Sequence, residues 1–409
     1  MAQATPDQVK VVDFAVREHR SLWGDAWRRL ISNRTAQLGM FIVFFMVFST
    51  TMAHFFWEYD PKIDSDYTLK LKPPNLTANE DVESVHIFGT DQLGRDIFRR
   101  VVHGGWNSIM VGFVAVGISL SIGGLLGLLA GFFEAVPISS TERYAFKGAV
   151  GLFLGLLPAW IADQNIIWVL FALLGLLSAY ADLHWSEKSW RAWLIILLGA
   201  AFGAVPALMT SIYTALFTGF LGLLIGMILS RRLGGELLSN TTMRGMDIIL
   251  AFPSYLLAIA IVVFLGPGLE KGMIAIGIVG IPVFARLVRS SVLSVIQKEY
   301  VLAANATGEG HSRIMFRHIL PNILSPIIVQ STMALAGAIL AAAALGYLGL
   351  GAQPPEPEWG SMLGDSYRFL TSGAWWAVIF PGVAIMLIVL GFNLLGDGLR
   401  DALDPKLKV

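Results

Sequence analysis

Ten long apolar stretches alternate with short polar segments along the chain. A helix needs about 20 apolar residues to cross the hydrocarbon core, and about 17 suffice when it runs straight. The pattern therefore predicts ten helical membrane spans, of which the third, fourth and eighth are short. They lie at 38–57, 109–133, 146–162, 165–181, 192–211, 213–230, 248–269, 272–286, 323–349 and 375–396.

Composition supports an all-α integral membrane protein. Hydrophobic residues make up 55% of the chain and charged residues only 14%, and the mean hydropathy is +0.66. The 29 basic residues balance 29 acidic ones, so the chain lacks the basic face of a nucleic-acid-binding protein. With no cysteine, disulfides, thiolate metal sites and cysteine nucleophiles are excluded.

Lys and Arg cluster in three places that should face the cytoplasm. These are the tail before residue 38, the polar segment 297–321 and the end with Arg400, Lys406 and Lys408. Both termini then lie inside, which requires an even number of spans. By the same alternation, residues 58–108 lie outside, and we expect strand or irregular structure there.

None of the ten stretches carries Asp, Glu, Lys or Arg in its interior. Ion-driven carriers usually need such residues as relays or counter-ions, so the energy for transport should come from elsewhere. The chain has no G-x-x-x-x-G-K-[S/T] phosphate loop, and any ATPase must be a separate polypeptide. A stand-alone carrier or channel stays open as an alternative, whereas a membrane enzyme lacks a catalytic motif such as H-E-x-x-H.

The polar segment 297–321 is longer than a simple turn needs. It should form a short helix over Tyr300 to Thr307, stopped by Gly308 in the left-handed conformation. A second helix is expected from Ser312 to Leu320, ended by Pro321. Small residues in the first helix would let another protein approach closely, so we interpret the segment as a docking site. A solvated connector is the alternative.

The same segment resembles the coupling loop of ABC importer permeases. The resemblance lies in two adjacent alanines, a glycine four residues after the second, and an Ile-Leu-Pro triplet, although Leu302 stands where the family has glutamate. It implies that this loop receives motion from the ATPase. The implied ATPase-coupling residues are Tyr300, Ala303, Ala304, Gly308, Ile319, Leu320 and Pro321.

Further motifs, in the same order, resemble the C-type permease of the oligopeptide, dipeptide and nickel family. They begin at Ser21-Leu22-Trp23, Gly89-Thr90-Asp91, Leu250-Ala251-Phe252, Gly346-Tyr347-Leu348 and Asn393-Leu394-Leu395. The resemblance covers roughly residues 20–135 and 240–405 and implies a type I permease fold with six core helices. The extra segment contributes the other four spans.

The resemblance also implies the assembly in which the chain works. A related permease would form a heterodimer with it, two cytoplasmic ATP-binding cassette subunits would bind ATP and Mg, and an extracytoplasmic solute-binding protein would deliver substrate. The chain itself would hold no cofactor or metal and would not be an enzyme. It would lie in the prokaryotic cytoplasmic membrane and import peptides by alternating access, with nickel chelates, glutathione or oligosaccharides as alternatives.

Four regions follow from this interpretation. Residues 1–37 form a cytoplasmic tail with an amphipathic elbow helix that carries Trp23 and Trp27, and residues 38–133 the first part of the permease core with external loop 58–108. Residues 134–240 are an inserted transmembrane module, and residues 241–409 the second part of the core with coupling loop 297–321.

Three local patterns carry their own expectations. Gly123, Gly127 and Gly131 recur every four residues and predict close helix packing. The charges in the Gly89–Asp96 segment can form a self-contained Arg–Asp brace, and substrate contact is the alternative. Glycines and prolines after Gly346 should end the ninth span and place Trp359 at the membrane interface or against a neighbouring subunit.

Overall fold

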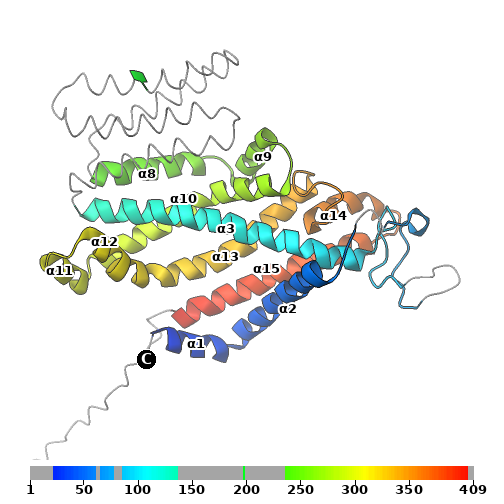
Figure 1. Cartoon of the computed structure of the whole chain (residues 1–409), viewed down its shortest axis with the longest axis horizontal. Coiled ribbons are helices and arrows are strands. Elements are labelled where there is room, and N and C mark those ends of the chain that lie inside the picture. The colour runs from blue at the N-terminus through cyan, green and yellow to red at the C-terminus, as the bar shows by residue number, and fades with distance from the viewer. Residues whose placement is uncertain (1–21, 61–64, 78–84, 137–196, 199–234, 404–409) are drawn as a thin grey trace, which may run out of the picture.

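The structure, a computed structural model, describes residues 22–60, 65–77, 85–136, 197–198 and 235–403. Long helices lie side by side along one axis (Figure 1). They are α1 (Leu22–Ser32), α2 (Arg34–Phe56), α3 (Ile97–Ala135), α8 (Gly235–Leu250), α9 (Ser254–Leu265), α10 (Leu269–Ile296), α11 (Glu299–Ala306), α12 (His311–Arg313), α13 (Leu320–Tyr347), α14 (Trp359–Ser366) and α15 (Trp376–Leu403). Short helical turns at Tyr67–Leu69, Ile314–Ile319 (η2, π-helical) and Tyr367–Phe369 complete the set.

The all-α membrane fold is confirmed. Among the described residues, five helical segments are long and apolar enough to cross a bilayer: α2, α3, α10, α15 and the continuous segment His311–Tyr347. Helices α8 and α9 together form a bent sixth. They correspond to the first, second and seventh to tenth predicted spans. The predicted spans 146–162, 165–181, 192–211 and 213–230 lie outside the described residues, apart from residues 197–198.

The seventh predicted span, 248–269, is wrong as a single helix. The chain bends by 87° between α8 and α9, and α9 has only 12 residues. Pro253 explains the break, because it lacks an N–H and disfavours helical backbone at the residue before it. A membrane crossing at this place therefore needs both α8 and α9.

The loop predicted at residues 58–108 is shorter than expected. Residues 58–108 were expected to be strand or irregular, but α3 already begins at Ile97. The Asp96 side chain caps this helix by accepting a hydrogen bond of 2.9 Å from the Arg99 amide. Charged residues in the first turns of α3 hid the helix from a search for apolar runs. The eighth span is longer for the same reason and runs to Ile296, past Arg286 and Arg289.

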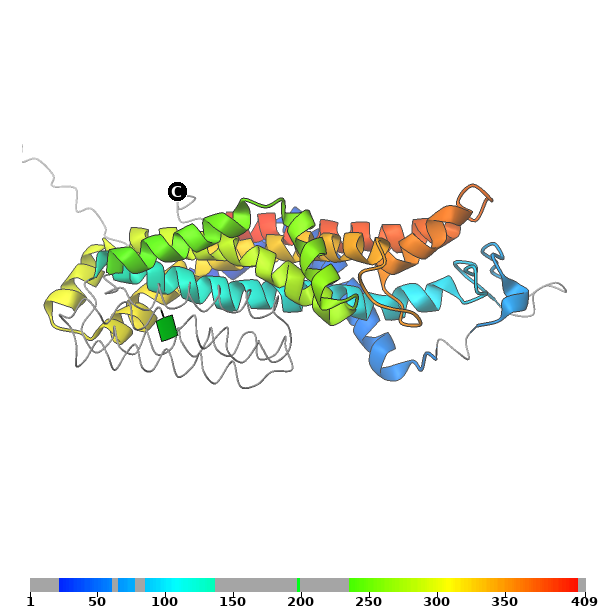
Figure 2. The same cartoon turned by 90° about the horizontal axis from the view of Figure 1, so that it is seen from above.

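The glycine stripe of α3 packs directly on α10, as predicted. A Cβ added at Gly123, Gly127 or Gly131 would lie less than 3.0 Å from backbone atoms of Ile281, Ala285 or Arg289. These glycines therefore bring two helix backbones into contact along three turns. We call this contact the glycine seam. Figure 2 shows α3 and α10 running side by side beneath α8 and α9.

The seam joins two apolar cores at opposite ends of the bundle. At one end, which we call the α11 end, the last turns of α3 and α10 bury Phe132 and Val292 with residues of α11 and α13. At the other, the α14 end, Trp359 is fully buried among residues of α2, α3 and α15. Figure 1 shows α11 and α14 at opposite ends of the helices.

The first helix, α1, packs against the bundle directly before α2. The Asn33 side chain accepts from the amides of Thr35 (3.0 Å) and Ala36 (3.4 Å) and starts α2 directly after α1. Leu30 and Ala36 are buried with Ala402 of α15, whereas Trp27 is 59% exposed. An exposed tryptophan beside arginines suits a helix at the membrane surface.

The seam can be tested by alanine substitutions at two glycines of α3. Alanine gains helix propensity of about 0.5–1 kcal/mol over glycine at either position. Gly117 has no atom within 4 Å of an added Cβ, so Gly117→Ala should keep that gain. Gly127→Ala should instead lose about 1–3 kcal/mol through overpacking. Thermal unfolding of the purified protein in detergent measures the difference, and equal midpoints for the two variants would disprove the seam.

Candidate functional site

The segment after α10 forms the predicted short helix. Helix α11 covers Glu299–Ala306, within one residue of the predicted limits at each end. Gly308 has φ +79°, and the amides of Thr307, Gly308 and Glu309 donate to the carbonyls of Ala303 (3.0 Å), Asn305 (3.1 Å) and Ala304 (3.2 Å). Glycine reaches this conformation without the penalty that a side chain adds, so Gly308 fixes the turn.

The second predicted helix does not end at Pro321. Residues His311–Arg313 are α-helical, Ile314–Ile319 form a π-helical turn, and α13 begins at Leu320, so helix runs unbroken from His311 to Tyr347. Pro321 lies in the first turn of α13. It directly follows the π-helical turn, where the Leu320 amide donates to the Met315 carbonyl five residues back. The missing N–H of the proline therefore falls where the helical hydrogen-bond pattern already changes, and the helix continues. We call the projecting segment, residues 297–321, the tip. It is thus a direct extension of a membrane span.

The tip has a buried and an exposed face, and these divide the predicted coupling residues. Ala304 and Ile319 are buried at 9% and 0% exposure, in one apolar cluster with Phe132 and Val292. Leu320 is half-buried. Four residues are exposed: Tyr300, Ala303, Gly308 and Pro321. The predicted set therefore holds both the anchor of the tip and part of its outer surface.

Sequence reasoning missed the most apolar part of that surface. Phe316 is 58% exposed and Leu302 is 56% exposed. Exposed aromatic and branched side chains in water are typical of interaction surfaces. A signal for Phe316 was present, because it is an aromatic residue beside Arg317 in a charged segment. We call the exposed residues Tyr300, Leu302, Ala303 and Phe316 the tip surface.

Charges surround the tip surface. His318 and Glu309 form a hydrogen bond of 2.8 Å that links the two arms of the turn. Arg313 and Arg317 are exposed on the second arm. Partial burial raises the pKa of the Tyr300 phenol, so it stays a neutral hydrogen-bond donor at physiological pH. The surface is thus an apolar patch with a basic margin.

At the opposite end, the Arg–Asp brace expected from the sequence is present. The Asp91 carboxylate accepts from Arg95 Nε (2.8 Å) and from Arg100, which is in the first turns of α3. Its other oxygen accepts from the amides of Leu93 (2.8 Å) and Arg95 (2.9 Å). Gly89 and Gly94 have φ +72° and +75° and form the turns that bring these groups together. The brace closes the irregular segment onto α3.

Trp359 is not at an interface, contrary to the prediction. Its side chain is fully buried, and its indole N–H donates to the Val101 carbonyl at 2.7 Å. The preceding Glu358 caps α14 by accepting from the amides of Gly360 (2.7 Å) and Ser361 (2.8 Å). Because the indole N–H already has a hydrogen-bond partner inside the protein, this tryptophan gains nothing from a position at the membrane surface.

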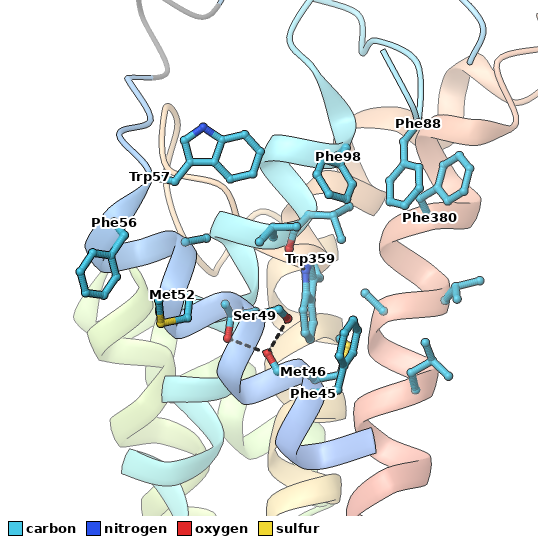
Figure 3. Close-up of a pocket in the computed structure, with 17 residues that line it drawn as sticks. Phe45, Met46, Ser49, Met52, Phe56, Trp57, Phe88, Phe98, Trp359 and Phe380 are labelled. Carbon is cyan, nitrogen blue, oxygen red and sulfur yellow. Dashed lines mark hydrogen bonds between the residues drawn. The ribbon is translucent and has the colours of Figure 1, made fainter. Parts of the chain in front are cut away.

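An apolar cavity of about 470 Å³ lies beside Trp359, between α2, α3 and α15. Figure 3 shows Met46 and Ser49 on one side of it, with Trp57 and Phe56 near the end of α2 and Phe88 against Phe380 on the far side. The rings of Phe88 and Phe380 stack at 3.9 Å. The lining carries no charged side chain, so the cavity suits apolar groups.

Metal chemistry finds no support in the part of the chain that is described. Among these residues, no three His, Asp or Glu side chains gather as a metal site would require.

Two family models match the chain. Residues 222–409 match the model described as "Binding-protein-dependent transport system inner membrane component". Residues 21–74 match the model described as "N-terminal TM domain of oligopeptide transport permease C". The first match covers α8 to α15 and includes the tip surface, and the second covers α1 and α2.

Curated relatives are similar over most of the chain. The dipeptide transport system permease protein DppC of Alkalihalophilus pseudofirmus is 38% identical over 95% of this chain and 91% of its own length. The di/tripeptide transport system permease protein DppC of Pseudomonas aeruginosa is 35% identical, over 93% and 91%. The glutathione transport system permease protein GsiD of Pectobacterium atrosepticum is 32% identical, over 95% and 93%.

Glu358 should make the stability of the protein depend on pH. Burial raises the pKa of its carboxyl to about 7, against 4.5 for a free side chain, although bonds from the Gly360 and Ser361 amides act in the opposite direction. The folded protein thus keeps a proton that the unfolded chain has lost. The free energy of unfolding should be highest below pH 4.5 and should decrease, by on the order of 3 kcal/mol, as the pH rises from there through about 7.

The measurement compares unfolding midpoints at pH 5 and pH 8 for the wild type and Glu358→Gln. The variant, which cannot ionise there, should show a smaller difference. Glu356→Gln, a change at an exposed carboxylate two residues away, is the control and should keep the wild-type difference. Identical pH dependence in all three proteins would contradict the assignment.

Proposed function

Because the chain belongs to the family of binding-protein-dependent transport system inner membrane components, we propose that it is the permease subunit of an ATP-driven importer of di- and oligopeptides. The observation that carries this function is the 38% identity to a dipeptide permease over 95% of the chain. The glutathione permease among the relatives makes modified tripeptides a second substrate class. The chain is a multi-pass protein of a bacterial membrane transport family.

In this function the tip surface receives motion from an ATPase made of other polypeptides. Two such subunits bind ATP and Mg, and the chain itself performs no bond chemistry. Tyr300, Leu302, Ala303 and Phe316 enter a groove of one ATPase subunit. Leu302 makes this contact apolar where the family pattern has glutamate, and Phe316 extends the apolar area.

The anchor of the tip supports this role. Val301 and Ala304 of α11 are buried in one cluster with Phe132 of α3, Val292 of α10 and Ile323 of α13. Packed interiors transmit displacement because they are dense and resist compression. Motion of α11 therefore reaches three long helices at once, and these open one side of the membrane while closing the other.

The complete transporter needs further subunits. A related permease completes the translocation pathway, and a solute-binding protein delivers peptide to the α14 end. The α11 end lies in the cytoplasm. Arg28, Arg29 and Arg34 near the first span, together with Arg313 and Arg317 of the tip, support this orientation.

Coupling is tested at the turn of the tip. Gly308→Val forces a branched side chain into a left-handed conformation at a cost of roughly 1–2 kcal/mol, which should lower peptide uptake per ATP hydrolysed by about tenfold. Gly310→Val is the control, because Gly310 has φ −66° and no atom within 4 Å of an added Cβ. Uptake and hydrolysis are measured in proteoliposomes that contain all subunits. Unchanged coupling in Gly308→Val would contradict the docking role.

Orientation is tested by cysteine labelling, which the absence of native cysteine makes free of background. Leu76 is 78% exposed at the α14 end, and Ser312 is exposed on the tip. A membrane-impermeant maleimide added to intact spheroplasts should label Leu76→Cys at once and Ser312→Cys only after permeabilisation. The reverse pattern would place the tip outside and overturn the proposed coupling.

A further inference from the structure

A polar cavity of about 610 Å³ lies at the α14 end, distinct from the apolar cavity beside Trp359. Its wall combines the Gln92–Arg100 segment, the end of α13 and the turns around α14. Figure 1 shows that α14 and the end of α13 lie next to the start of α3 at this end of the bundle. Volumes of 300–1,000 Å³ are typical of small-molecule sites.

The inner wall of this cavity has an uncompensated positive charge. Arg95 and Arg100 are 4% and 2% exposed and both line the cavity, yet they share one carboxylate, Asp91. The oxygens of Asp91 already accept two guanidinium and two amide hydrogen bonds. Two buried cations against one anion leave a net charge that is costly to bury unless a further anion joins them.

Unused hydrogen-bonding groups lie at the same wall. The Nε–H of Arg100 has no hydrogen-bond partner among the described residues, and neither has the side-chain oxygen of Gln92. Both residues line the cavity. Buried polar groups in native proteins are nearly always paired, so an unpaired guanidinium N–H in a cavity wall indicates a place for an acceptor. A carboxylate is the acceptor that guanidinium groups hold most strongly.

The rim of the cavity has the opposite character. Glu356, Asp365 and Arg368 are exposed and line the cavity, so the rim has two carboxylates and one guanidinium. The Arg368 guanidinium lies over the Tyr367 ring at 5.7 Å, and neither carboxylate forms an ion pair with any described residue. Tyr347 and Tyr367 also line the cavity, with ring centroids 5.6 Å apart. Such aromatic faces accept side chains of different kinds. A cationic inner wall and a rim of net negative charge match a ligand that carries a carboxylate at one end and an ammonium group at the other.

We propose that this cavity is a transit site for a zwitterionic dipeptide, whose α-carboxylate binds Arg95 and Arg100 and whose α-ammonium group lies toward Glu356 and Asp365. The proposal rests on the proposed function, because it takes peptide as the cargo. The depth of the two guanidinium groups favours a small ligand that enters whole. Capture of an acidic side chain from the solute-binding protein is the competing outcome that the experiment must separate.

The experiment uses the complete transporter in proteoliposomes, with ATP inside and the solute-binding protein outside at saturating peptide. Uptake of alanylalanine is compared with uptake of alanylalanine amide, which lacks the carboxylate. Arg100→Gln removes one guanidinium but leaves Asp91 bonded to Arg95 and to two amides. Arg99→Gln is the matched control, because the Arg99 guanidinium lies over the Trp57 ring at 5.3 Å and donates to the Glu58 carbonyl at 2.9 Å.

The proposal expects Arg100→Gln to lower the ratio of free to amidated peptide uptake by about tenfold, the size of one charge-assisted hydrogen bond. Uptake of the amide should stay at the wild-type rate, and Arg99→Gln should keep the wild-type ratio. Since the same saturated binding protein serves every assay, a changed ratio belongs to the permease. An unchanged ratio, or equal loss for both peptides, overturns the proposal.

A second variant covers the case in which Arg100→Gln fails to assemble. Glu356→Gln combined with Asp365→Asn changes only exposed side chains and should lower the preference for alanylalanine over its N-acetyl form by several-fold. An unchanged preference overturns the proposal. If Arg100→Gln instead weakens the stimulation of ATP hydrolysis by peptide-free binding protein, the arginines serve protein docking and the proposal also fails.

Failure of the proposed function gives a different result. In that case the wild-type assembly takes up neither peptide when ATP, both ATPase subunits and the binding protein are present. If only the transit-site proposal is wrong, wild-type uptake is intact and Arg100→Gln leaves the ratio of free to amidated peptide uptake unchanged. The two hypotheses are therefore separated by the wild-type measurement itself.

Discussion

The close approach of α3 and α10 is the constraint on which the rest of the structure depends. Gly123, Gly127 and Gly131 have no side chain to hold the two backbones apart, and Ile281, Ala285 and Arg289 fill the space. Lipid tails are as apolar as leucine, so helices in a bilayer gain from tight packing rather than from leaving water. A stripe of glycines maximises that gain, and it fixes the register of one helix on the other.

The seam makes one rigid body of structures that lie far apart in the sequence. The Arg–Asp brace is attached to the start of α3, while the cluster that anchors α11 contains Phe132 and Phe133 near the end of the same helix. Close to that end, Arg289 of α10 pairs with Glu134 of α3 at 2.7 Å. Contacts at either end therefore share a helix pair that cannot slide without breaking backbone contact.

Apolar length and glycine spacing predicted most of what is described, because membrane helices must satisfy their own backbone groups. Errors arose where a local chemical detail overrides length. Asp96 caps a helix that starts with charged residues, Pro253 breaks an apolar run in two, and Pro321 follows a π-helical turn through which the helix continues.

In the candidate site, too, local features could be predicted from the sequence and tertiary ones could not. The turn at Gly308 needs only a local signal, a glycine after a run of small helical residues, and it was predicted. Which residues of the tip are buried could not be predicted. Ala303 and Ala304 are adjacent and identical in sequence, but only Ala304 faces the cluster of α3, α10 and α13. Trp359 was misplaced for a related reason: the partner of its indole N–H is a carbonyl of Val101, 258 positions earlier. The difference between a surface and an anchor is therefore a tertiary property, and in the proposed function it decides which residues touch the ATPase and which carry its motion into the membrane.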